Sequence, residues 1–189
     1  MKKLLLLVCV LLMVSFPAQA RYKCETNSAT DEVKYIATKM KDNFSKVDMI
    51  EFGKITKRNG DSIYYVIPAF SGKGFGKTIL ADVGTINVDG DAYTVTKDTN
   101  ASHITWKNYK PRSIHVLAEY VVPTDIAEKI ITSSGVITFE FEIEGRGKKI
   151  LDFGLKTSDE IRFVTNRNFE DYRAVSKKEL VPQYTEKEK

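Results

Sequence analysis

A glycine-rich segment with two lysines, Ser71-Gly72-Lys73-Gly74-Phe75-Gly76-Lys77-Thr78, has the residue types of a phosphate-binding loop. It differs from the nucleotide motif G-x-x-x-x-G-K-[ST] only by Ser71 at the first glycine position. In that motif the amides at the start of a helix point at the phosphates. Residues 79–84 lead instead into β-branched residues and a hairpin whose first strand is expected at 85–88. We therefore interpret the segment as an exposed loop that bears Lys73 and Lys77, and expect no nucleotide there.

Three oxygen-bearing side chains, Asn87, Asp89 and Asp91, alternate as in a calcium-binding loop. Such a loop has glycine at position 6 and glutamate at position 12, whereas Gly90 falls at position 4 here. Asp89-Gly90 is typical of a two-residue hairpin turn. The sequence therefore predicts neither calcium nor any other metal or cofactor.

The only two histidines are His103 and His115. If residues 103–121 form a hairpin that turns at Lys110, the two imidazoles lie about 10–13 Å apart along the strands, too far to share a metal. An odd-length turn would place His103 opposite Glu119. Each histidine could then act alone in acid–base chemistry, because imidazole titrates near neutrality. A secreted hydrolase, or an inhibitor of one, is therefore the alternative function.

Glu140, Glu142 and Glu144 form a row of carboxylates at the spacing of a strand, about 6.6–7 Å between neighbours. That spacing falls in the range of the paired carboxylates of glycosidases. The same alternation, however, is how the solvent-facing side of a half-buried strand is kept polar. We assign no catalytic residue to this row.

The segment Trp106-Lys107-Asn108-Tyr109-Lys110-Pro111-Arg112 combines aromatic and basic side chains at an expected turn. Aromatic rings stack on flat ligands, while lysine and arginine pair with carboxylates or phosphates. With the Lys73/Lys77 loop and the basic turn at 145–149, the sequence has three cationic loops, which would form a rim that attracts anions if they met at one end of a sheet. The candidate ligand-binding residues are Trp106, Lys107, Tyr109, Lys110, Arg112, Lys73 and Lys77.

The first twenty residues have the pattern of a cleavable export signal. A basic start is followed by the apolar run Leu4–Val14 and by small residues at Ala18 and Ala20. Eleven apolar residues are too few to span a bilayer, which needs about 20. Neither cysteine follows the small residue that a lipoprotein signal requires. We expect cleavage after Ala20, export to the periplasm or the cell exterior, and no stable membrane insertion afterwards.

The charge and cysteine content limit the partners of the exported chain. The sequence has 29 Lys plus Arg against 25 Asp plus Glu, and loss of Lys2 and Lys3 with the signal leaves a balance of +2. That balance is too even to predict nucleic-acid binding. Only Cys24 remains after cleavage, so no internal disulfide is expected. The fold must be held by its hydrophobic core, which a chain of this size can supply.

An amphipathic helix is expected at residues 30–46, because Val33, Ile36, Ala37 and Met40 recur at helical spacing. It follows an irregular leader at 21–29. Two shorter helices are expected at 124–132 and 158–172. A single domain would then span residues 30–175, and the charged tail 176–189 would fray.

Two turn signals predict antiparallel hairpins. Asn59-Gly60 separates strands at 49–57 and 62–70, and a two-residue turn there would pair Phe52 with Ile67. Asp89-Gly90 separates strands at 85–88 and 91–97, and would pair Ile86 with Tyr93. A third pair is expected at 105–109 and 113–122.

The clearest strand alternates Ile137, Phe139, Phe141 and Ile143 with polar residues, and a return strand follows at 151–155. For the two apolar faces to meet, the numbers of paired residues must have an even sum, as for Phe139 with Phe153. That requires a turn of odd length, which 145–147 can provide.

Together these patterns predict an α+β fold with a mainly antiparallel sheet, barrel-like or sandwich-like, packed by the helix at 30–46 and one or two shorter ones. The expected function is that of an exported, non-enzymatic binding or envelope-associated module. Its partner would be an extracellular or envelope component, for which the loops favour acidic groups.

Overall fold

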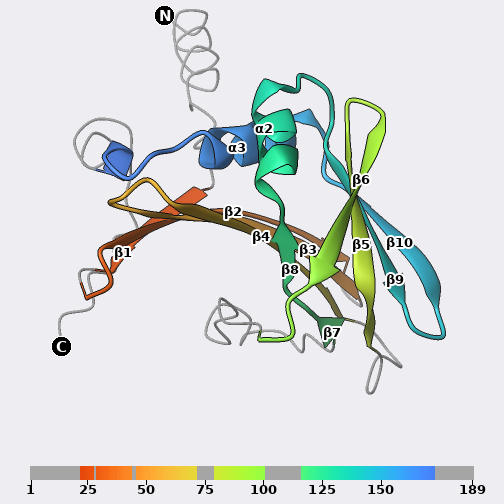
Figure 1. Cartoon of the computed structure of the whole chain (residues 1–189). Coiled ribbons are helices and arrows are strands. Elements are labelled where there is room, and N and C mark those ends of the chain that lie inside the picture. Colours follow the sequence, from red (N-terminus) through yellow and green to blue (C-terminus); the bar gives the residue numbers. More distant parts are fainter. Residues whose placement is uncertain (1–21, 28, 44–45, 72–78, 101–115, 173–189) are drawn as a thin grey trace, which may run out of the picture.

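The structure, a computed structural model, describes residues 22–27, 29–43, 46–71, 79–100 and 116–172 (Figure 1). In these residues the chain forms one antiparallel sheet of ten strands and two helices. The strand order is β1-β2-β3-β4-β8-β6-β5-β9-β10, and β7 pairs with β4 beside β8. The strands are β1 Tyr22–Asn27, β2 Glu32–Asn43, β3 Lys46–Lys57, β4 Ser62–Ser71, β5 Leu80–Val88, β6 Asp91–Lys97, β7 Val116–Leu117, β8 Tyr120–Val122, β9 Thr138–Ile143 and β10 Gly147–Asp152.

The predicted α+β class with a mainly antiparallel sheet is confirmed, but its N-terminal helix is wrong. Residues 32–43 form strand β2, and the expected irregular leader contains β1. Val33, Tyr35 and Ala37 face the main core at the two-residue period of a strand, which a helix would not place on one face. Pairing with β3 over twelve residues, from Glu32 opposite Lys57 to Asn43 opposite Lys46, overrides the helical spacing.

The hairpin at Asn59-Gly60 forms, but its predicted register is off by one residue. Phe52 lies opposite Val66, because the turn has three residues instead of two. Gly60 has a φ of 95°, and its amide donates to the carbonyl of Lys57 over 3.0 Å. Such a turn with glycine in the left-handed region is the common three-residue solution. This register directs Phe52 and Val66 to the same core, which the predicted one would have prevented.

The other two hairpins agree better with the sequence. Ile86 lies opposite Tyr93 as predicted, across the turn of Asp89 and Gly90. Strands β9 and β10 join through a turn of odd length, so the numbers of paired residues have an even sum, as predicted. The turn comprises residues 144–146, so Phe139 pairs with Leu151 and not with Phe153.

Helix α2, Thr124–Thr132, has the predicted bounds, whereas α3, Leu155–Thr165, begins and ends earlier than expected. Both helices lie on one face of the sheet (Figure 1). Ile126 and Ile130 of α2 and Ile161 and Val164 of α3 join the main core against that face.

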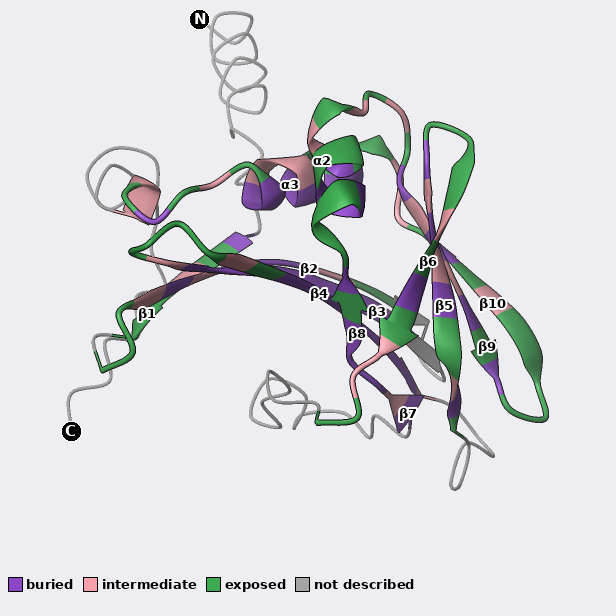
Figure 2. Ribbon diagram, viewed as in Figure 1, coloured by how far each residue is buried: buried purple, intermediate pink, exposed green. Residues whose placement is uncertain are grey.

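The sheet is buried on both faces along its central strands (Figure 2). The main core lies under the helices, and a smaller cluster on the other face contains Met49, Ile55, Tyr65, Ile67 and Ala69. Strand β4 supplies Tyr64 and Val66 to the first core and Tyr65 and Ile67 to the second. A long run of buried residues in one strand is what coverage on two sides requires.

The open sheet curls until its last strand, β10, reaches the β2–β3 hairpin. The Lys149 ammonium of β10 lies 3.0 Å from the Asp48 carboxylate of β3. The Lys41 ammonium of β2 donates to the carbonyl of Asp152 and lies over the ring of Phe153. These contacts turn the sheet into a partly closed, sandwich-like shell around the main core.

Candidate functional site

One end of the sheet collects the strand ends that flank the candidate loops. Phe70, at the end of β4, pairs with Val116 at the start of β7. Leu80, at the start of β5, pairs with Ile143 at the end of β9. The turn 144–146 lies there too, since the Glu144 amide donates to the carbonyl of Ile79 over 2.9 Å. We call this the loop end; it is the lower end in Figure 1.

The sixth strand completes the loop end. Lys97, its last residue, pairs with Tyr120 of β8 and donates from Nζ to the carbonyl of Leu80 over 3.0 Å. The Asp98 amide donates to the carbonyl of Glu119 over 2.8 Å. The residues on either side of 72–78 and of 101–115 therefore lie on neighbouring strands beside the β9–β10 turn.

A bulge in β5 opens the sheet at the loop end. Leu80 pairs with Ile143 and Gly84 with Phe141, so three residues of β5 lie opposite one residue of β9. Such insertions bend a strand and redirect its side chains. A methyl group on Gly84 would lie 2.5 Å from the Phe141 ring, so only glycine permits the strands to meet again.

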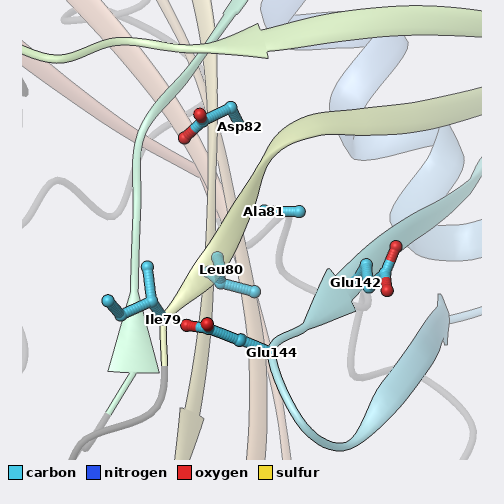
Figure 3. A pocket seen from close by; sticks show the side chains of 6 residues that line it. All are labelled: Ile79, Leu80, Ala81, Asp82, Glu142 and Glu144. Atoms are coloured by element: carbon cyan, nitrogen blue, oxygen red, sulfur yellow. The ribbon is translucent and has the colours of Figure 1, made fainter.

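The bulge borders a hollow of about 360 Å³ (Figure 3). Its wall from β5 is aliphatic, with Ile79, Leu80 and Ala81, and its other lining side chains are carboxylates. Leu80 is buried and Ile79 is 56% exposed. The lining residues are Ile79, Leu80, Ala81, Asp82, Glu142 and Glu144.

Two side chains hold the bulge in place from the inner face. The Tyr120 hydroxyl donates to the carbonyl of Ala81 over 2.6 Å. Burial, and secondarily the charge of Asp82, raises the pKa of Tyr120, which keeps this donor protonated. The Lys97 ammonium, besides its bond to Leu80, lies 3.6 Å from the Asp82 carboxylate. The backbone of the hollow is thereby fixed.

The carboxylate row of β9 is divided between two settings. Glu140 lies 2.6 Å from the Lys148 ammonium of β10, and this contact raises the pKa of Lys148. Glu142 and Glu144 line the hollow instead. Within the described part of the chain, neither of these two glutamates has an ion-pair partner. The expectation of a simply polar strand face therefore missed a recess on it.

All seven candidate ligand-binding residues lie outside the described residues, as do His103, His115 and the signal segment at 1–20. Glu119, which an odd-length turn would place opposite His103, is described and is 1% exposed. The structure therefore places the strand ends beside the candidate loops, and leaves the residues themselves as predictions.

The comparisons with known proteins add no relative. No family model, curated protein or solved structure matches the chain. Among the residues that the structure describes, no helix is both long enough and apolar enough to cross a membrane. In the same residues, no group of three or more His, Cys, Asp or Glu side chains has the arrangement of a metal site.

The sequence contained one signal for the hollow that its periodicity alone did not reveal. Gly84 interrupts an apolar strand, and an isolated glycine in such a strand often marks a bulge. Ile79 and Val83, 56% and 51% exposed, do not fit a strand that buries one face. The proximity of Glu142 and Glu144 to this segment depends on β5 pairing with β9, which no local pattern reveals.

Proposed function

We propose that the chain is an exported, non-enzymatic binding module that contacts an envelope or extracellular partner through its loop end. One observation carries this proposal: the strand ends that flank 72–78 and 101–115, and the turn 144–146, meet at one end of the sheet. A ligand that touches several loops at once gains more contact area than one that touches a single loop.

The chemistry of the described loop end fits binding better than catalysis. The described residues that line the hollow have aliphatic and carboxylate side chains, and none of these has a hydroxyl, thiol or imidazole. A nucleophile with an adjacent base is what covalent hydrolysis uses. Tyr109 and Arg112 of the neighbouring segment would supply the stacking and ion-pairing contacts of a binding surface.

A photocrosslinking experiment tests the proposal. The photoreactive residue p-benzoylphenylalanine replaces Tyr109 in cells, and the same replacement at Asn59, in the turn at the opposite end of the sheet, is the control. We expect a discrete adduct from position 109 that is absent from position 59. Arg112→Ala should weaken the adduct, whereas Arg58→Ala should leave it unchanged. Equal adducts from both positions, or no effect of Arg112→Ala, would contradict the proposal.

A further inference from the structure

We propose that the hollow beside the β5 bulge binds a lysine or arginine side chain that a partner polypeptide presents. The inference rests on the proposed binding function and names the chemistry of one contact at the loop end. It concerns the described residues of β5 and β9 and needs none of the candidate loop residues.

The aliphatic wall of the hollow selects a ligand with an apolar part. Ile79 is more than half exposed, and Leu80 and Ala81 continue the same wall. Covering solvent-exposed aliphatic side chains with another apolar group is favourable, because it removes apolar surface from water. A bare Ca²⁺ or Mg²⁺ ion binds oxygen ligands only. It would therefore make no contact with this aliphatic wall.

The carboxylates require that the other part of the ligand be cationic. Asp82 of β5, Glu142 of β9 and Glu144 of the following turn line the hollow, with Asp82 and Glu144 on one side of Leu80 and Glu142 on the other (Figure 3). Lys97 contacts Asp82, and Lys148 contacts Glu140. Lys148 also lies opposite Glu142 in the pairing of β9 with β10, and the two charges interact. Three acids therefore line the recess against two described lysine ammoniums, which leaves one negative charge in excess to complement a cation.

The backbone carbonyls of the hollow already accept hydrogen bonds, so a ligand would bind to the carboxylates. The carbonyls of Ile79, Leu80 and Ala81 already accept bonds from the Glu144 amide, the Lys97 ammonium and the Tyr120 hydroxyl. A ligand whose polar groups are all hydrogen-bond donors suits this arrangement, because the groups left to bind it are acceptors. Lysine and arginine side chains have donors alone.

A lysine or arginine side chain combines both required parts. Its methylene stem covers apolar surface while its charged head stays among polar groups. Here the stem would lie against Ile79 and Leu80, and the head beside Glu144, whose carboxylate lies next to both (Figure 3). Ile79 is 56% exposed, so a side chain can reach this wall from a polypeptide that lies across the strands.

NMR titration tests this contact, with the protein purified in the form that accumulates in the cell. The probe is the peptide acetyl-Ala-Lys-Ala-amide, and its neutral control has glutamine in place of lysine. We expect the amide shifts of residues 79–82 and 142–144 to move with a dissociation constant in the millimolar range, which is ordinary for one side chain. The glutamine peptide should bind at least about tenfold more weakly.

Two variants separate the hollow from the general charge of the surface. The double variant Glu142→Gln and Glu144→Gln should weaken binding of the lysine peptide at least about tenfold. Glu128→Gln, which removes an exposed charge from α2, should leave it unchanged. Shifts spread evenly over all acidic regions, or equal affinity in the double variant, would overturn the inference.

The outcome is independent of the crosslinking experiment on the candidate loops. A crosslink at position 109 without any lysine-peptide shift would keep the binding function and reject this contact. Lysine-peptide binding without a crosslink would keep this contact and reject the proposed role of the candidate loops.

Discussion

At the scale of single residues, Cys24 illustrates how strand pairing changes an exposed-looking position. Its segment becomes β1, paired with β2 at Tyr35, and its side chain packs partly against the main core. Burial, assisted by the charge of Glu25, raises the pKa of the Cys24 thiol to about 12. A protonated thiol is a poor nucleophile, so we expect Cys24 to be chemically quiet.

Alkylation at pH 8 tests this expectation. The thiolate population of Cys24 should be about a thousandfold lower than that of a free thiol, and the higher intrinsic reactivity of a more basic thiolate offsets part of this loss. We expect iodoacetamide to modify Cys24 about 50-fold more slowly in the folded chain than in urea, as measured by mass spectrometry of its peptide. Equal rates in the two states would show that the thiol is not held in the core.

The same shift predicts a pH dependence of stability. Because the folded chain holds a pKa above the ordinary thiol value, this contribution is present below that value and is lost as the pH rises toward 12. Urea unfolding between pH 8 and 11 should show a steeper loss of stability for the natural chain than for Cys24→Ala. Parallel curves would contradict the assignment.

Gly53 is a second residue whose role depends on packing. The Tyr65 ring of the neighbouring strand lies over it, so that a methyl group there would come within 2.0 Å of the ring. The Tyr65 hydroxyl then reaches the buried Glu51 carboxylate over 3.3 Å. We expect Gly53→Ala to lower the free energy of unfolding by about 1–3 kcal/mol.

Urea titration measures this effect, with Thr94→Ala on exposed β6 as the control. A second test combines Gly53→Ala with Tyr65→Leu, which removes the clashing atoms. The double variant should lose less stability than the sum of the two single changes. Additive losses would mean that the ring does not cover Gly53.

At the scale of elements, Asp89 connects a hairpin turn to the segment between α2 and β9. Its φ of 50° fits the turn that the sequence predicts. Its carboxylate also accepts the Gly135 amide over 2.7 Å and the Ser134 amide over 3.2 Å. Arg162 holds the same segment by donating to the Ser133 hydroxyl and the Gly135 carbonyl.

We expect Asp89→Ala to cost about 1–3 kcal/mol, because two amides lose a charged acceptor. Asp89→Asn should cost less, since asparagine tolerates the left-handed turn and keeps one acceptor oxygen. Hydrogen exchange at Ser134 and Gly135 should accelerate most in the alanine variant. Unchanged exchange at these amides would separate the turn from the α2–β9 segment.

The elements also show what the sequence could and could not predict. Turn residues such as Asp89-Gly90, and the alternation of Phe139 and Phe141, predicted hairpins and a strand because their causes are local. The segment 32–43 fitted two periodicities at once, and only its pairing with β3 decided between them. The hollow is less predictable still, because its two walls come from the β5 and β9 regions, and the 49 residues 89–137 separate these two strands.

At the scale of the whole molecule, the proposed export signal predicts which form of the chain accumulates in the cell. Small residues at Ala18 and Ala20 are the positions that signal peptidases read. We expect the secreted chain to begin at Arg21, as N-terminal sequencing would show. Ala18→Arg should block cleavage and retain the longer chain in the membrane fraction, whereas Ser15→Ala should be cleaved normally. An unprocessed natural chain would remove the proposal of export.

The sheet has a weak line across it. Among the described strands, the pairing that connects β1 to β4 with β5, β6, β9 and β10 passes through the three residues of β8. A hairpin such as β2–β3 is joined over twelve residues, whereas β8 shares only three partners with β4 and two with β6. If mechanical force stretched the molecule across these strands, we expect the short pairings of β8 to break first.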